Sequence, residues 1–317
     1  MHQELSYAHN WLADGHSIVM AVVSETWGSA PRPKGSLMII HADGRFEGSV
    51  SGGCVEGSVI AEATALMGTT TSKTLNFTVS SEDAWQIGLA CGGKIQIQLF
   101  PISVNDTASF TETLNTCNNR CSGELRLTKQ KCCATFNPTH TPSASKSLMS
   151  DDDEALTLHI QPNPRLFVVG AVHITQALIP MSIACGYEVT VIDPRGLFVE
   201  KRHFSGATII QDWPDEFFSS SPLDSTSALV TLTHDPKIDD AALVYGLESD
   251  AFYIGSLGSK KTHASRLKRL ENQGIDKATL KRVHGPIGLN ISAKSPAEIA
   301  VSIMAELTAA RRGINAV

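Results

Sequence analysis

The amino-acid sequence contains no long hydrophobic run. A transmembrane helix needs roughly 20 consecutive, mostly apolar residues, and the longest apolar runs here, Ile18–Val23 and Leu37–Ile40, have the length of strands. The N-terminal residues Met1–Glu4 do not start a basic and then apolar leader, so we expect no secretory signal. The sequence therefore predicts a protein without a membrane span, and we expect it in the cytoplasm.

An excess of basic residues is also missing. The chain has 26 Lys and Arg against 32 Asp and Glu, a formal net charge of −6. Binding of nucleic acid depends on clustered Lys and Arg that neutralise phosphates, so we expect no nucleic-acid partner. The contents of 42% hydrophobic and 18% charged residues are typical of a globular protein, and 317 residues suffice for two domains.

The cysteines do not form the framework of a disulfide-rich secreted protein. They number seven, which is odd, and their spacing is irregular, so a reducing cytoplasm is the simplest location. Cys117, Cys121, Cys132 and Cys133 fit no recognised zinc pattern, and the last two are adjacent. We therefore expect no metal site at these four cysteines.

Residues 1–102 have the patterns of an N-terminal α+β domain. Runs rich in Val and Ile indicate strands, Asp43-Gly44 between two short runs is a hairpin signal, and Gly15 favours a helix end. The predicted helices are His2–Asp14 and Val55–Met67, and the predicted strands are Ser17–Ser24, Leu37–Ile40, Phe46–Val50 and Lys94–Phe100, the last closed by Pro101.

Residues 103–162 change in composition. They are rich in Asn, Thr, Ser and Lys and end in the acidic run Asp151–Glu154. Such a composition is typical of a solvated, partly disordered connection, so we predict a variable linker here. Only Thr157–Gln161 is predicted to be a strand.

Residues 163–317 alternate between short apolar runs and helical patterns. This alternation predicts a Rossmann-like, doubly wound parallel sheet covered by helices. Ser295, Pro296 and Glu298 mark the start of the last helix as N-cap, first helical residue and capping-box partner. The predicted strands are Arg165–Val169, Glu188–Ile192, Ala207–Gln211, Ala228–Thr233 and Ala251–Ile254.

A doubly wound sheet usually binds its ligand at the carboxyl ends of the strands. Gly170 and Asp193 there have the spacing of a dinucleotide fingerprint, but Val172 and Thr175 occupy the positions of its second and third glycines. Ordinary NAD(P) binding is therefore poorly supported. The candidate binding residues at these ends are Gly170, His173, Asp193, Arg195, His234, Gly255, Ser256, Gly258, Ser259 and Lys260.

The segment Gly255–Lys260 precedes a helix predicted to begin near Ser259. The N–H groups at a helix start favour a phosphate, and Lys260 and Lys261 add positive charge. A Gly-rich turn with exposed lysines explains the same residues equally well. Asp235 is predicted to cap a helix, and the role of His234 stays open.

Two segments of the first domain place a cysteine among glycines. Gly52, Gly53 and Cys54 lie between a predicted strand and helix, and Cys91, Gly92 and Gly93 precede a strand. Backbone N–H groups in such segments can approach an anionic ligand, but each thiol can equally be a small packing residue.

The long loop Thr26–Ser36 is rich in Gly and Pro, and loops of this length in compact domains are commonly functional. In this loop Arg32 and Lys34 can bind a phosphate, and Trp27 can stack on a ring of the ligand. The sequence contains no Ser–His–Asp signature and no pair of catalytic carboxylates.

Several of these segments, taken in order, resemble the XdhC/CoxI family. The matching segments are Gly28–Arg32, Ala42–Arg45, Gly48–Gly57 and Leu89–Gly93 in the first half, and Val168–Ile174, Val191–Arg195, Tyr253–Ser259 and Gly285–Leu289 in the second. The resemblance covers nearly the whole chain except Ser103–Ser150.

The resemblance implies a maturation factor rather than an enzyme. Family members bind the molybdenum cofactor, protect it, work with a cysteine desulfurase during its sulfuration and deliver it to xanthine dehydrogenase or a related molybdenum hydroxylase. A dithiolene-bound metal is soft and suits thiols, so Cys54 and Cys91 become candidate contacts of molybdenum or sulfur. Whether either thiol ligates the metal, carries sulfur or shapes its loop stays open, as does homodimer formation.

Two other functions remain as alternatives. One is an NAD(P)-dependent oxidoreductase that uses the Rossmann-like domain, which Asp193 favours and Val172 opposes. The other is an interaction protein in which the acidic, cysteine-bearing middle segment is a docking arm.

Overall fold

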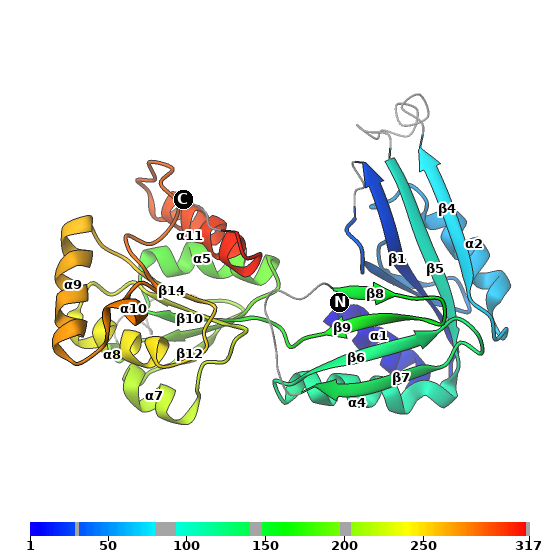
Figure 1. Cartoon of the computed structure of the whole chain (residues 1–317), viewed down its shortest axis with the longest axis horizontal. Helices are drawn as coiled ribbons and strands as arrows, with labels where there is room; N and C mark the ends of the chain where they lie inside the picture. Colours follow the sequence, from blue (N-terminus) through cyan, green and yellow to red (C-terminus); the bar gives the residue numbers. More distant parts are fainter. Residues whose placement is uncertain (29–31, 80–92, 140–147, 197–203, 315–317) are drawn as a thin grey trace. The chain divides into compact units, whose positions relative to one another are not determined.

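The computed structural model describes residues 1–28, 32–79, 93–139, 148–196 and 204–314. The chain forms two compact units, and the first ends at Pro162 while the second begins at Asn163 (Figure 1). Each unit has its own sheets and its own hydrophobic cores. The mixed α/β architecture predicted from the sequence is confirmed.

The first unit contains an antiparallel five-stranded sheet in the order β3-β2-β1-β5-β4. The predicted hairpin is present, because β2 pairs with β3 across the Asp43-Gly44 turn. Pro101 does not close its strand as predicted but lies inside β5 opposite Val19, beyond the last residue paired with β4. The strands are β1 (Ile18–Gly28), β2 (Leu37–His41), β3 (Phe46–Gly48), β4 (Lys73–Val79) and β5 (Gly93–Ile102).

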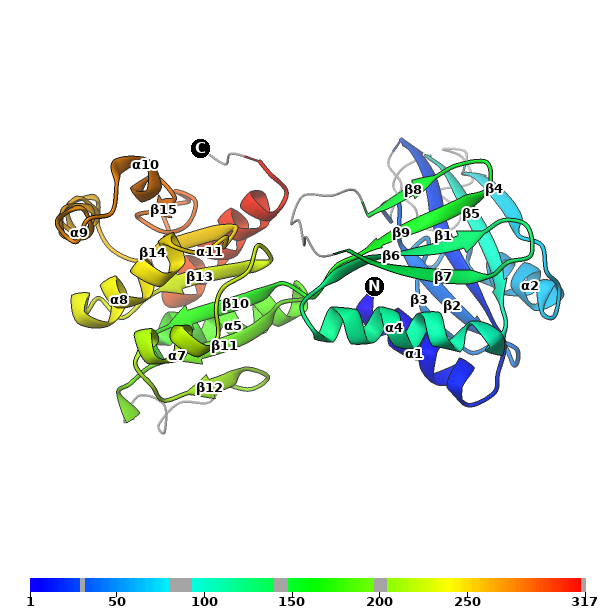
Figure 2. The ribbon, with the colours of Figure 1, turned by 60° about the horizontal axis from the view of Figure 1, so that its bottom comes forward.

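The prediction that residues 103–162 form a solvated linker is wrong. In the described part of this segment a helix and a second antiparallel sheet, in the order β7-β6-β9-β8, fold into the first unit (Figure 2). Its elements are η1 (Val104–Asp106), α4 (Thr107–Asn118), β6 (Ser122–Thr128), β7 (Ala134–Thr139), β8 (Met149–Asp151) and β9 (Ala155–Ile160). The proposed docking arm therefore has no support from the described residues of this segment.

Two cores hold the first unit together. One joins a face of the five-stranded sheet, the helices α1 (His2–Ala13) and α4, and the four-stranded sheet, with Phe100, Phe110 and Leu158 fully buried. The other packs the opposite face of the five-stranded sheet against α2 (Glu56–Leu66) through residues such as Val59 and Ala63. Helix α2 is thereby fixed on the sheet, and the loop before it carries Cys54.

The second unit contains a parallel six-stranded sheet in the order β12-β11-β10-β13-β14-β15. The sequence predicted β10 and β11 with the observed bounds, and it missed the short edge strand β15. The strands are β10 (Arg165–Val169), β11 (Glu188–Ile192), β12 (Thr208–Ile210), β13 (Ser227–Thr231), β14 (Tyr253–Ser256) and β15 (Val283–His284).

Helices cover both faces of this sheet, with α5 and α11 on one side and α7 and α8 on the other (Figure 1). The predicted caps are present: Ser295 and Glu298 form the capping box of α11, and the Asp235 side chain accepts from the Lys237 N–H. The helices are α5 (His173–Ala184), α7 (Pro214–Ser220), α8 (Pro236–Leu247), α9 (Lys260–Asn272), α10 (Lys277–Leu280) and α11 (Pro296–Arg311).

Across the described ranges, no helix has both the length and the apolar character needed to cross a membrane.

Candidate functional site

The loop between β3 and α2 is organised around the carboxylate of Glu56. This side chain is buried, and it accepts hydrogen bonds from the Ser49 hydroxyl at 2.7 Å, from the Ser51 and Gly53 N–H groups at 2.9 Å each, and from the Ser51 hydroxyl. Burial acts to raise the pKa of Glu56, but the hydrogen bonds from Ser51 and Ser49 outweigh it and lower the pKa to about 2. Glu56 is therefore an ionised, internally bonded carboxylate.

Three more N–H groups of this loop are also bonded within the loop. Gly52 N–H donates to the Ser49 hydroxyl at 2.9 Å, and the N–H groups of Cys54 and Val55 donate to the Ser51 hydroxyl at 3.0 Å. In this structure the N–H groups of Gly52 and Gly53 are therefore bonded to the loop's own side chains, and their binding of an anionic ligand stays a prediction. The two glycines instead supply backbone conformation, with φ of 77° and 119°.

Cys54 is a free, half-buried thiol at the end of this rigid loop, one residue before the N-cap Val55 of α2. It packs beside the core between α2 and the sheet. The loop therefore presents a soft sulfur atom from a fixed backbone, which is a geometry that suits a ligand contact.

Arg32 lies against the same loop. Its Nε donates to the Ser49 carbonyl at 3.2 Å. Lys34 instead pairs with Glu25, and the exposed Trp27 lies at the end of strand β1, one residue before Gly28. The structure thus brings Arg32, but not Lys34, to the Cys54 loop.

Gly93, which ends the second predicted cysteine segment, lies at the same end of the five-stranded sheet. Gly93, the first residue of β5, is opposite Gly28, the last residue of β1. The Ser49 N–H bonds to the Leu37 carbonyl at this end of β2. Cys91 and Gly92 lie outside the described residues, and Cys91 precedes Gly93 by two positions along the chain.

In the second unit, the strand end that resembles a dinucleotide fingerprint is filled by the chain itself. Asp193 is fully buried and accepts from the Ala171 N–H at 2.7 Å and from Arg195, whose N–H, Nε and Nη2 approach within 3.0 Å. Burial acts to raise the pKa of Asp193, but the bonds from Arg195 and Ala171 lower it. In this structure Asp193 is thus bonded to its own chain and Arg195 is partly exposed, and ligand binding by these two residues stays a prediction.

The glycine positions of that fingerprint are closed as well. Thr175 is buried and donates its hydroxyl to the Gly170 carbonyl, and Val172 is the N-cap of α5. Gly170 itself has a φ of 120°, and a Cβ there would lie 3.0 Å from Thr233, so it is needed for close packing. His173 is exposed on the first turn of α5. A pyrophosphate has no close backbone approach here.

Two more predicted residues are part of the core. Ser256 is fully buried and its hydroxyl bonds to the Thr231 hydroxyl at 2.5 Å. A Cβ on Gly255 would lie 2.6 Å from Ile287, so this glycine allows close packing. Gly255 and Ser256 thus serve packing, whereas Gly258 and Ser259 lie in the more exposed loop that follows and Lys260 begins α9. Contact of these residues with a ligand stays a prediction.

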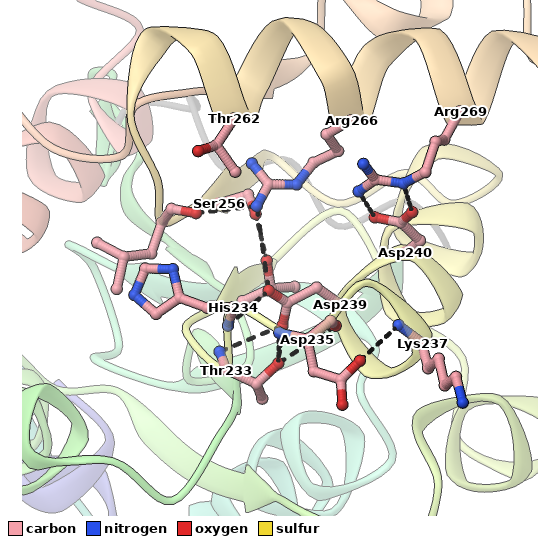
Figure 3. A network of polar contacts seen from close by, with 12 residues as sticks. Thr233, His234, Asp235, Lys237, Asp239, Asp240, Ser256, Thr262, Arg266 and Arg269 are labelled. Carbon is pink, nitrogen blue, oxygen red and sulfur yellow. Dashed lines mark hydrogen bonds and ion pairs between the residues drawn. The ribbon is translucent and has the colours of Figure 1, made fainter.

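Figure 3 shows the polar network beside that loop. The buried Asp239 accepts from the Thr233 N–H and hydroxyl and from the His234 N–H, which holds the exposed His234 at a φ of 64°. Burial raises the pKa of Asp239. Arg266 lies 4.0 Å from this carboxylate with its side chain 2% exposed. No sequence pattern indicates Arg266, because a buried arginine and a surface arginine look alike in a charged helix.

The chain matches two family models. A model described as the XdhC Rossmann domain matches residues 166–307, and a model described as the XdhC and CoxI family matches residues 11–78. The two matches lie in different units of the chain and leave residues 79–165 between them unmatched.

Curated relatives and a solved structure agree with these matches. The molybdenum cofactor insertion chaperone PaoD of Escherichia coli K12 is 28% identical, over 97% of this chain and 87% of its own length. A protein of Bacillus subtilis 168 named as a probable subunit of xanthine dehydrogenase is 28% identical over 96% of this chain and 97% of its own length. A crystal structure named as a xanthine dehydrogenase from Bacillus halodurans has a TM-score of 0.78 at 26% identity and covers 98% of this chain and 96% of its own.

Proposed function

The chain belongs to the XdhC and CoxI family, and from this premise we propose that it is an accessory protein that binds the molybdenum cofactor and delivers it to a xanthine dehydrogenase-type molybdenum hydroxylase. The names of two relatives, a molybdenum cofactor insertion chaperone and a probable component of xanthine dehydrogenase, support this role.

The observation that carries the proposal is the Cys54 loop. A carrier must hold a soft metal centre without keeping it permanently, and a single thiol on a preorganised loop suits that task. The bonds of Ser49, Ser51 and Gly53 to Glu56 fix the loop before the cargo arrives, so little ordering is needed on binding. Arg32 adds a guanidinium beside the loop that can bind the cofactor's phosphate.

Finer steps are part of the same proposal. We infer that the bound cofactor is sulfurated with the help of a cysteine desulfurase before transfer to the client enzyme. Cys91 is the second thiol of the proposal, since its segment enters the sheet at Gly93, beside the end of β1. An oxidoreductase that uses NAD(P) finds no support in the closed strand end around Asp193.

The test is the molybdenum and pterin content of the protein purified from cells that make the cofactor. We expect Cys54→Ser and Cys54→Ala to remain folded and to retain several-fold less cofactor than the wild type, with Cys91→Ala also reduced. Cys185→Ala is the matched control, because Cys185 is an exposed cysteine that follows α5 in the other unit.

One result would refute the carrier role, and another would refute only the part of the proposal that assigns Cys54 to it. A wild-type protein that is empty and also fails to capture supplied cofactor would refute the carrier role. Full retention by both Cys54 variants would leave the carrier role standing and remove this thiol from it.

A further inference from the structure

The start of helix α9 differs from the two other candidate anion sites of the described chain. Glu56 occupies the N–H groups before α2, and Asp193 occupies the Ala171 N–H before α5. The first turn of α9 has no acidic residue and carries Lys260 and Lys261. Its N-cap Ser259 accepts from the Thr262 N–H at 3.1 Å, so the end of the helix is well formed.

A buried guanidinium lies beneath this start. Arg266, two turns into α9, is 2% exposed and donates through Nη2 to the Leu257 carbonyl at 2.9 Å. Its Nε and Nη1 are buried and have no hydrogen-bond partner among the described residues. Burial lowers the pKa of Arg266.

The neighbouring carboxylate compensates this charge only in part. Asp239 is 4.0 Å from Nη2, beyond hydrogen-bond distance, and it already accepts three hydrogen bonds from Thr233 and His234. Buried donors without partners are costly and commonly mark a binding function. Arg266 is therefore a buried cation whose Nε and Nη1 have no acceptor among the described residues.

The bond from Arg266 also sets the direction of the next peptide. Because C=O and N–H point to opposite sides of a trans peptide, a Leu257 carbonyl turned inward to Arg266 turns the Gly258 N–H outward. Gly258 has a φ of 150°, and a Cβ there would lie 3.1 Å from the Thr262 side chain and 3.7 Å from Nη2 of Arg266. The positive φ and the tight contact with Thr262 favour glycine at this position.

We propose that residues 257–261, the α9 N-terminal loop, bind a phosphoryl group. The N–H groups of Gly258, Lys260 and Lys261 donate to its oxygens, both lysine ammonium groups neutralise its charge, and Arg266 acts from below as a fixed positive charge. The exposed His234, on the same side of the network as Thr262 in Figure 3, contacts whatever the phosphoryl group is attached to. This site does not depend on the carrier role proposed above.

The experiment is calorimetric titration of the full-length protein with inorganic phosphate and, separately, with AMP, at constant ionic strength. We expect saturable binding that Lys260→Ala together with Lys261→Ala weakens about tenfold. Lys268→Ala together with Lys281→Ala is the control, because it removes the same charge from exposed positions, with Lys268 about 12 Å further along α9. Equal Kd values for the two probes identify the phosphoryl group as the whole ligand, and tighter AMP binding adds a contact beyond it.

Arg266→Met tests the buried charge, and a thermal melt establishes that the variant is folded. We expect it to weaken phosphate binding while Arg269→Met, whose guanidinium is paired with Asp240, does not. The proposal is overturned if the wild type binds neither probe, or if the Lys260 and Lys261 double variant binds as tightly as its control. Cofactor loading plays no part in these measurements, so they fail or succeed independently of the carrier test.

Discussion

At the scale of single residues, Glu56 decides whether the Cys54 loop is rigid. Its two carboxylate oxygens accept four hydrogen bonds, two from hydroxyls and two from N–H groups. A glutamine at this position keeps one oxygen and turns an amide N–H₂ toward donors, so at least one buried donor loses its partner. We expect Glu56→Gln to lower the free energy of unfolding of the first unit by about 2 kcal/mol.

Urea unfolding followed by circular dichroism measures this loss. Glu62→Gln in the same helix is the control, because Glu62 is exposed and pairs only with Lys73, and its effect should stay below about 0.5 kcal/mol. Equal stability of the two variants would show that the Glu56 network does not hold the loop.

The same residue gives a pH dependence. The pKa of Glu56 falls from an ordinary 4.5 to about 2 on folding, so its contribution to stability is complete above pH 4.5 and is lost as the pH falls toward 2. We therefore expect the difference in stability between wild type and Glu56→Gln to shrink between about pH 4.5 and about pH 2. A difference that stays constant over this range would contradict the lowered pKa.

Single residues also show what the sequence could not reveal about the site. Asp193 has the spacing of a ribose ligand, but whether a carboxylate at a strand end faces a ligand or its own chain depends on Arg195 and Ala171 in three dimensions. Cys54 was recognisable from its glycine-rich setting, whereas the acceptor that fixes it, Glu56, is one glutamate among many in the sequence.

At the scale of elements, the sequence predicted helices and strands well where short-range residue patterns define them. The strands β10 and β11 are short apolar runs next to Gly170 and Asp193, and their bounds agree with the prediction. Of the strands in residues 103–162, only β9 was predicted, as Thr157–Gln161. The others were missed because their partners are distant: Leu125 in β6 is opposite Leu158 in β9. Their solvent-facing residues are polar, so the composition is that of a loop.

The cap of α11 offers a prediction at this scale. Ser295 accepts from the Glu298 N–H at 3.3 Å, and Glu298 accepts from the Ser295 and Lys294 N–H groups at 2.8 Å. Ser295→Ala should lower the free energy of unfolding of the second unit by about 1 kcal/mol, because one helix-start N–H loses its partner. Urea unfolding measures it, with Ser265→Ala on the exposed face of α9 as the control. Equal losses of stability in both variants would show that the Ser295 cap does not stabilise the second unit.

At the scale of the whole molecule, the chain consists of two units that each have their own core. The Cys54 loop belongs to the first unit, and the strand ends around Asp193 and Arg266 belong to the second. Since proteins with two domains commonly unfold in more than one step, a variant in one unit should change one transition and leave the other in place. Stability effects can thus be assigned to a unit before any functional effect is interpreted.

The closed strand end of the second unit yields a prediction for the full-length protein. A ligand selective for the folded state, present at 100 times its Kd, stabilises by about 2.7 kcal/mol and would raise the Tm by several degrees. Because Asp193 is bonded to Ala171 and Arg195, and Thr175 fills the place of a glycine, NAD(H) and NADP(H) should raise the Tm no further than AMP at equal concentration. Differential scanning fluorimetry of the intact chain checks this. A larger rise with a dinucleotide, abolished in Asp193→Asn, would mean that Arg195 moves aside for a ribose and would restore the oxidoreductase alternative.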